Sequence, residues 1–269
     1  MEPTSHYVHA GGLDLHYVDW GGEGRQPILL LHGLQDCARL WDFFAETVRE
    51  HYHVIALDHR GHGDSPPTST DRYRLIDYVG EARDVITQLG LSDVILAGHS
   101  AGSKNAWMLA AEHPELVAKL IITDMDPDQH NPGSVDMITR YKSESDDYPD
   151  LGAVIERIRS RQPESSDDVL RHTAEQLTRP NEAGGLTWKR HRDVVLHYDR
   201  PDVWATLPEV RVPTLIVRGG DSTLLNGPVA QRMQKEIPDC KLVEIPNAAH
   251  WVHLEQPDAY TATVAEFLG

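Results

Sequence analysis

The sequence predicts one α/β domain, with a mostly parallel, doubly wound sheet of about eight strands and a helical lid inserted over one edge of that sheet. Two observations favour this fold class. Short apolar runs rich in β-branched residues alternate with longer amphipathic segments, and the alternation stops between about residues 127 and 207. A chain of 269 residues is long enough for such a domain to bury a large core.

Six buried strands are predicted from apolar runs of about five residues that end in polar or turn-forming residues. They cover residues 28–32, 53–57, 94–98, 119–123, 214–218 and 241–245. Residues 6–19 alternate in polarity around Gly11 and Gly12, which predicts an antiparallel hairpin at the edge of the sheet. Helical segments fit between the strands, at residues 38–50, 76–90, 102–113, 226–236 and 257–268.

The interrupted segment is predicted to be a cap rather than a second domain. Residues 143–150 are acidic and turn-rich, helical patterns follow near 151–161 and 166–178, and residues 180–185 break the pattern again. We therefore expect residues 1–126 and 208–269 to form the core, and residues 127–207 to form a helical cap over the C-terminal ends of the strands.

Composition excludes several classes of partner. The net charge is −17, from 42 acidic and 25 basic residues, so nucleic acid and anionic membranes would be repelled. No run approaches the roughly 18 apolar residues of a membrane span, and residues 1–11 lack a secretory apolar region, so a cytoplasmic location is expected. No metal-ligand spacing, phosphate-binding glycine loop or dinucleotide motif is found, so neither a metal nor another cofactor is expected.

A candidate nucleophile stands between a predicted strand and a predicted helix. Gly98-His99-Ser100-Ala101-Gly102 has small residues on both sides of the serine, which lets the backbone turn sharply and expose the hydroxyl. The helix that follows offers unpaired N–H groups and the positive end of its dipole to a developing oxyanion. This context predicts that Ser100 is a nucleophile.

These motifs, taken in order, resemble the α/β-hydrolase family from about residue 25 to residue 269. Residues 31–34 (Leu-His-Gly-Leu) are similar to the oxyanion loop of that family, and residues 58–65 to the turn after its fourth strand. Residues 248–251 (Ala-Ala-His-Trp) are similar to the loop that carries the catalytic histidine, although the family usually has glycine in place of Ala249. The resemblance implies an oxyanion hole made by the backbone N–H groups of Leu34 and Ala101.

A serine hydroxyl needs a base within hydrogen-bonding reach at neutral pH. Among 16 histidines, His250 is the best candidate, because it follows the last predicted strand in a loop that could overhang the nucleophile. His253 is the second candidate. An ordinary imidazole pKa of about 6.5 predicts that kcat/KM rises between about pH 6 and 7.5.

The acid that would orient this histidine has more than one candidate. The family commonly places it three residues after the glycine that ends a late strand, but counting from Gly219 this position is Ser222, with Asp221 one residue earlier. Some members carry the acid at the end of the preceding strand, which here is Asp124. We favour Asp124, within about 2.6–3.2 Å of the histidine Nδ1, with Asp221 as the alternative and Asp126 as a further candidate.

The expected activity is cleavage of a small-molecule carboxylic ester or lactone through an acyl-enzyme on Ser100. Trp41, Trp188, Tyr198 and Trp251 are candidate walls of the substrate pocket, and Arg190 is a candidate partner for a substrate carboxylate.

Three other activities stay open. They are hydrolysis of a carbon–carbon bond in a vinylogous diketo acid, cofactor-free dioxygenation of a heteroaromatic ring, and binding of a ligand without catalysis.

Overall fold

The central sheet confirms the predicted fold class. The computed structural model describes residues 2–269 and has an eight-stranded sheet in the order β1-β2-β4-β3-β5-β6-β10-β11. Only the β1–β2 and β2–β4 pairs are antiparallel, and the other neighbours are parallel. The strands are β1 (Thr4–Ala10), β2 (Leu13–Asp19), β3 (Pro27–Leu31), β4 (His53–Leu57), β5 (Val94–His99), β6 (Val117–Thr123), β10 (Thr214–Gly219) and β11 (Cys240–Ile245).

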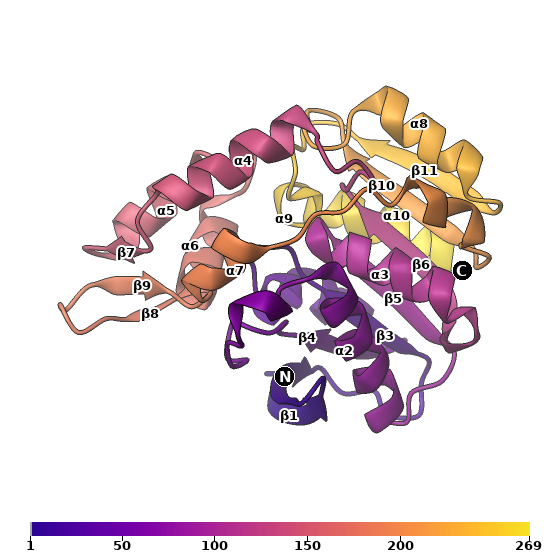
Figure 1. Cartoon of the computed structure of the whole chain (residues 1–269), viewed down its shortest axis with the longest axis horizontal. Helices are drawn as coiled ribbons and strands as arrows, with labels where there is room; N and C mark the ends of the chain where they lie inside the picture. Colours follow the sequence, from indigo (N-terminus) through magenta and orange to yellow (C-terminus); the bar gives the residue numbers. More distant parts are fainter. Residues whose placement is uncertain (1) are drawn as a thin grey trace.

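Helices cover both faces of the sheet, as the alternation of apolar runs predicts (Figure 1). One apolar core lies under α2 (Leu75–Gln88), α3 (Ala101–Glu112) and α8 (Gly227–Glu236). The other lies under α1 (Asp42–Val48) and α10 (Pro257–Leu268). The predicted helix over 38–50 is in fact a 3₁₀ turn, Ala38–Trp41, followed by α1, and the short helix α9 (Val252–Glu255) precedes α10.

The register of three neighbouring strands brings distant residues to one edge of the sheet. His99 at the end of β5 pairs with Thr123 at the end of β6, and Thr123 pairs with Val217 of β10. Ser100 and Asp124 are the next residues after the first two strands, so both emerge at the same level of the C-terminal edge. Open α/β sheets bind their ligands at this edge.

The segment between β6 and β10 contains four helices and a small sheet. They are α4 (Pro132–Ser143), β7 (Asp147–Tyr148), α5 (Leu151–Arg159), α6 (Asp167–Leu177), β8 (Thr178–Pro180), β9 (Leu186–Trp188) and α7 (Arg192–His197), with strand order β7-β9-β8. These elements lie together beyond the left end of the sheet (Figure 1). Helix α4 was not predicted, although the sequence marks its start. The Asn131 side chain accepts hydrogen bonds from the backbone N–H groups of Gly133 and Ser134, and Pro132 occupies the first position of the helix.

One buried lysine connects the core to both ends of this segment. The Lys104 Nζ of α3 donates to the carbonyl of Pro201 at 3.1 Å and lies 3.5 Å from that of Pro127, where the chain leaves and re-enters the core. We propose residues 127–207 as a cap on a core of residues 1–126 and 208–269, of which Met1 lies outside the described part. Within residues 2–269, no helix has the length and apolarity needed to cross a membrane.

Candidate active site

The backbone around Ser100 forms the sharp turn that the sequence predicts. Ser100 has φ 52° and ψ −123°, a strained conformation for a residue other than glycine. The turn depends on its two flanking glycines. A Cβ on Gly98 would lie 2.4 Å from backbone atoms of Gly102, and one on Gly102 would lie 2.2 Å from the carbonyl oxygen of Leu31. Only glycine at both positions lets α3 pack this closely against β5 and β3.

The Ser100 hydroxyl is hydrogen-bonded to an imidazole, which is itself bonded to a carboxylate. His250 Nε2 lies 2.8 Å from Ser100 Oγ, and His250 Nδ1 lies 2.7 Å from Asp124 Oδ2. All three residues are buried, and Asp124 is fully inaccessible. This is the hydrogen-bond order of a serine-type catalytic triad, in which the acid fixes the tautomer and the imidazole accepts the serine proton.

Asp124 is held by groups from the next strand. Its Oδ1 accepts the backbone N–H of Gly219 at 3.1 Å, and its Oδ2 accepts the hydroxyl of Ser222 at 2.5 Å. Ser222 stands where the family pattern would place an acid, and its side chain here supports the acid from β6. The alternative acid, Asp221, is exposed, and its backbone N–H bonds to the carbonyl of Ala248.

The third candidate acid, Asp126, is bonded to other side chains. Asp126 pairs with Arg200 at 2.5 Å and accepts a hydrogen bond from the Asn131 side chain. The 2.7 Å distance from Asp124 to His250 falls inside the predicted range. The geometry therefore favours Asp124 over both alternatives.

Two backbone N–H groups near Ser100 are free to bind an oxyanion. Within residues 2–269, neither the N–H of Leu34 nor that of Ala101 donates a hydrogen bond to the protein. The Leu34 N–H belongs to the same peptide unit as the carbonyl of Gly33, which accepts a hydrogen bond from His32 Nδ1 at 2.7 Å. His32 Nε2 accepts the His59 N–H at 3.1 Å, which fixes the tautomer. His32 thus orients the peptide that carries one of the two donors.

The space beside Ser100 is small. It is a cavity of about 10 Å³, room for one water molecule, between the oxyanion loop, the loop of His250 and α4. Met137 and Tyr141 of α4 cover it from the cap side. Trp251 also lines it, as predicted for a pocket wall.

The other predicted aromatic walls lie elsewhere. Trp41 is fully buried in the core and stacks on His253, with ring centroids 4.4 Å apart. Trp188 belongs to an apolar cluster that joins cap residues to core residues, including Trp251, and Tyr198 packs near Tyr78, with centroids 6.3 Å apart. Large aromatic side chains bury much apolar surface, and these three pack against other side chains rather than facing the cavity.

Arg190 is buried but does not reach the cavity. It forms an ion pair with Asp146, and its Nε lies 3.3 Å from Oε1 of Gln35, which does line the cavity. The guanidinium therefore has a carboxylate partner within the cap. The structure does not bring it together with Ser100, contrary to the pocket role predicted for it.

Sequence reasoning also missed residues that line the cavity. Met137 and Tyr141 lie on the unpredicted helix α4, and Asp36 follows the oxyanion loop. A signal for Asp36 was present, because it is an acidic residue five positions after the end of β3, a strand that ends at the same edge of the sheet as β5. The helix cap at Asn131–Pro132 could have located α4.

Burial changes the expected pH dependence. Burial lowers the pKa of His250 below its ordinary value, and the hydrogen bond to Asp124 opposes this shift only in part. The base form therefore persists to lower pH, so the acid limb of kcat/KM should have its midpoint below about pH 6.5, rather than spanning pH 6 to 7.5.

This limb is measurable with an ester whose chemistry limits turnover, between pH 4.5 and 8. His250→Gln should remove the limb together with most of the activity. A profile that is flat over this range, or a midpoint clearly above pH 6.5, would argue against His250 as the base.

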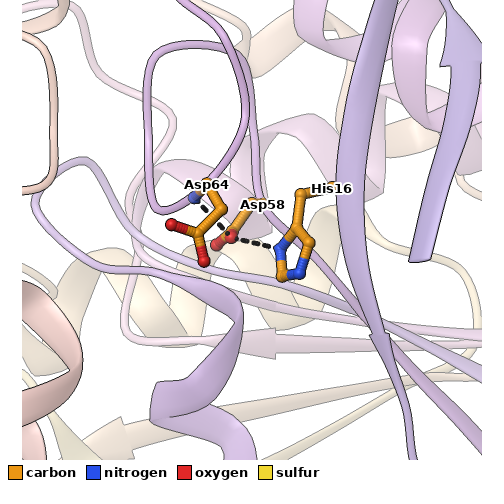
Figure 2. Close-up of side chains that lie close together, drawn as sticks. All are labelled: His16, Asp58 and Asp64. Atoms are coloured by element: carbon orange, nitrogen blue, oxygen red, sulfur yellow. Dashed lines mark hydrogen bonds and ion pairs between the residues drawn. The ribbon is translucent and has the colours of Figure 1, made fainter. Parts of the chain in front are cut away.

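One further cluster has the composition of a metal site. His16, Asp58 and Asp64 lie close together near β4, as Figure 2 shows. Asp58 already accepts hydrogen bonds from His16 Nδ1 at 2.7 Å, from the Asp64 N–H at 3.0 Å and from the Ala38 N–H at 2.7 Å. A Cβ on Gly63 would lie 2.1 Å from Asp58 Oδ2. These contacts explain the cluster as the hydrogen-bonded centre of the turn over residues 58–65.

Comparison with known proteins agrees with this architecture. A family model described as "alpha/beta hydrolase fold" matches residues 26–257. The sn-1-specific diacylglycerol lipase ABHD11 of Mus musculus is 29% identical over 95% of this chain and 85% of its own length. Epoxide hydrolase 4 of Mus musculus is 25% identical, over 97% of this chain and 78% of its own length.

A solved structure is similar over the whole chain. The crystal structure of E-2-(acetamidomethylene)succinate hydrolase has a TM-score of 0.92 and 26% identity, and 99% of each chain is covered. All three relatives are named as hydrolytic enzymes. With the family model matching most of its length, this chain belongs to the alpha/beta hydrolase fold family.

Proposed function

We propose that this protein is a serine hydrolase that cleaves a small-molecule carboxylic ester or lactone through an acyl-enzyme on Ser100. The observation that carries the proposal is the continuous hydrogen-bond chain from Ser100 through His250 to Asp124. His250 Nε2 takes the hydroxyl proton as Oγ attacks the carbonyl carbon. The negative charge that forms on the carbonyl oxygen is stabilised by the N–H groups of Leu34 and Ala101.

The tetrahedral intermediate then collapses and the leaving oxygen receives the proton from His250, which releases the alcohol. In a lactone this alcohol stays attached to the acyl group. Water next gives its proton to His250 and attacks the acyl carbon, so the acid leaves and Ser100 recovers its proton. Asp124 stays ionised throughout and stabilises the imidazolium.

Ester chemistry fits the serine nucleophile better than epoxide opening, which is the activity named for one relative. Attack of Ser100 on an epoxide would give an alkyl ether, which the same site could not readily hydrolyse. Attack on an ester or lactone gives an ester, which it could. The name of the diacylglycerol lipase also indicates ester cleavage within the family.

The small volume of the cavity restricts the size of the substrate. A volume of about 10 Å³ does not admit even a small ester, so Met137 and Tyr141 must move for a substrate to reach Ser100. Short acyl groups would require the smallest displacement, and we expect them to be hydrolysed best.

No specific observation favours the alternatives. Hydrolysis of a diketo acid would need a cation such as Arg190 to bind the substrate carboxylate. The Arg190 guanidinium is instead paired with Asp146. Dioxygenation of a heteroaromatic ring has no additional support. A binding protein without catalysis would have no use for the ordered Ser100–His250 pair.

A panel of p-nitrophenyl acetate, short-chain alkyl esters and small lactones tests the proposal. Turnover of at least one of them, lost in His250→Gln, would support it. If the folded protein bound ester or lactone ligands without releasing acid, the proposed activity would be refuted in favour of a binding role.

A further inference from the structure

A second buried carboxylate lies beside the nucleophile and has no part in the triad. Asp36 lines the same cavity as Ser100, and its side chain is only 5% exposed. A Cβ built on Gly33 would lie 2.7 Å from Asp36 Oδ2 and 3.2 Å from the Cβ of Ser100. The carboxylate and the nucleophile thus pack against the same glycine.

Asp36 is held in place by two ring N–H groups. His99 Nδ1 lies 3.1 Å from its Oδ2, and Trp251 Nε1 donates to its Oδ1 at 3.2 Å. The other ring nitrogen of His99, Nε2, lies 3.0 Å from the carbonyl of His250. That carbonyl can only accept, so Nε2 carries a proton and a second proton is shared between His99 Nδ1 and Asp36.

The Asp36 carboxyl favours its ionised form. Burial on its own would raise the pKa of the Asp36 carboxyl, but the hydrogen bond and charge of His99, with the Trp251 N–H, hold this pKa well below its ordinary range. Asp36 is therefore an anion within the cavity. A carboxylate has about four acceptor positions, and the protein fills two of those on Asp36.

A substrate anion would find no cationic side chain free of a partner among the described residues that line the cavity. Among the described residues 2–269, those that line it include no lysine and no arginine. Arg190 lies behind Gln35 and is paired with Asp146. Arg161, which stacks on Tyr141, is paired with Glu144. His99 also lines the cavity, but its two ring nitrogens are already bonded to Asp36 and to the His250 carbonyl. A substrate carboxylate next to the scissile carbonyl would thus meet Asp36 without a cation free to pair with it, whereas a hydroxyl, amide N–H or ammonium group would gain an ionised acceptor.

We propose that Asp36 is a specificity-determining residue that selects substrates with a hydrogen-bond donor near the scissile carbonyl and rejects those with a carboxylate there. This assignment rests on the proposed ester hydrolysis and narrows its substrate class. The expected ester carries a hydroxyl, amide or amino group on the carbon next to the carbonyl or on the alcohol side within two carbons.

Matched methyl esters test the acyl side, with kcat/KM measured by pH-stat at pH 7.5. Methyl 2-hydroxypropanoate and methyl 2-methoxypropanoate differ in the donor, and monomethyl propanedioate and methyl butanoate differ in the negative charge. The pair 2-hydroxyethyl butanoate and 2-methoxyethyl butanoate tests the alcohol side. The wild type should prefer the hydroxyl ester over its methoxy partner by at least about tenfold in one of the two hydroxyl pairs, and should disfavour the anionic ester by a similar factor.

Asp36→Asn keeps the shape of the side chain but removes its charge. It should reduce the hydroxyl preference, and raise the relative rate on the anionic ester, by about tenfold each. Trp251→Phe is the matched control, since it removes one donor to Asp36 but leaves the carboxylate, and it should keep the hydroxyl preference.

The wild-type ratios need no variant, so the test stands even if Asp36→Asn does not fold. Ratios near one in both hydroxyl pairs, or an anionic ester cleaved as fast as methyl butanoate, would overturn the role of Asp36 and leave ester hydrolysis intact. Failure of the wild type to hydrolyse any ester of the set would instead overturn the proposed function, and the role of Asp36 with it.

Discussion

Replacing Ser100 with alanine should lower kcat for ester hydrolysis by about three orders of magnitude or more, because the variant lacks the oxygen that would form the acyl-enzyme. The fold should persist. Alanine has the same Cβ as serine and can keep the backbone turn at φ 52°. Circular dichroism and thermal unfolding should therefore resemble those of the wild type.

A matched control is Ser143→Ala. This serine is exposed at the end of α4 and bonds only to the carbonyl of Arg140, so its loss should leave kcat nearly unchanged. An alanine variant of Ser100 that kept more than about a tenth of the wild-type activity would show that acyl transfer does not pass through this serine.

The second large effect separates the two candidate acids. Asp124→Asn should lower kcat by a factor on the order of 10⁴, because an amide at this position can hold His250 in the wrong tautomer. Asp221→Asn should have only a mild effect, since Asp221 is exposed and only its backbone N–H is bonded near the histidine loop. The two variants are measured with the same ester at the same pH, and both are checked for folding.

The reverse ranking would transfer the acid role to the loop after β10. The roles of Ser100 and His250 would stand in that case. Equal and severe losses in both variants, with intact folding, would show that neither residue alone orients the imidazole.

The central strands could be predicted closely because they are buried on both faces and therefore read as continuous apolar runs. All six predicted strands are present, with bounds within two residues of those observed. The burial predicted for residues 241–245 is wrong: β11 lies at the edge of the sheet, and of its residues only Ile245 is buried. The sharp backbone turn at Ser100 could also be predicted, because it depends on local sequence. Its glycines, the strand before it and the helix after it are all local signals.

The acid was harder to identify, because it depends on how two strands lie side by side. Asp124 and Asp221 both follow strands that end at the same edge, and neither local sequence says which side chain faces His250. The structure favours Asp124, because its carboxylate bonds to His250 Nδ1 and also accepts the hydroxyl of Ser222. Such a contact between strands is not visible in one sequence.

The pocket was predicted least well. Trp41 and Trp188 were chosen for their aromatic character, but proximity in sequence to a site does not fix which way a side chain faces. The cavity is instead bounded by Asp36 and by Met137 of α4, a helix that was not predicted from the sequence. Cap helices pack on the core through tertiary contacts, which local patterns specify weakly.

The most direct test of the central claim is labelling with a fluorophosphonate, followed by peptide mapping by mass spectrometry. The proposed mechanism predicts one label per chain on Ser100, loss of ester hydrolysis in step with labelling, and no label in Ser100→Ala. Labelling should also slow markedly in His250→Gln, because the hydroxyl then lacks its base. A protein that hydrolyses esters but carries the label on another residue, or stays active and unlabelled, would contradict the assignment of Ser100 as the nucleophile.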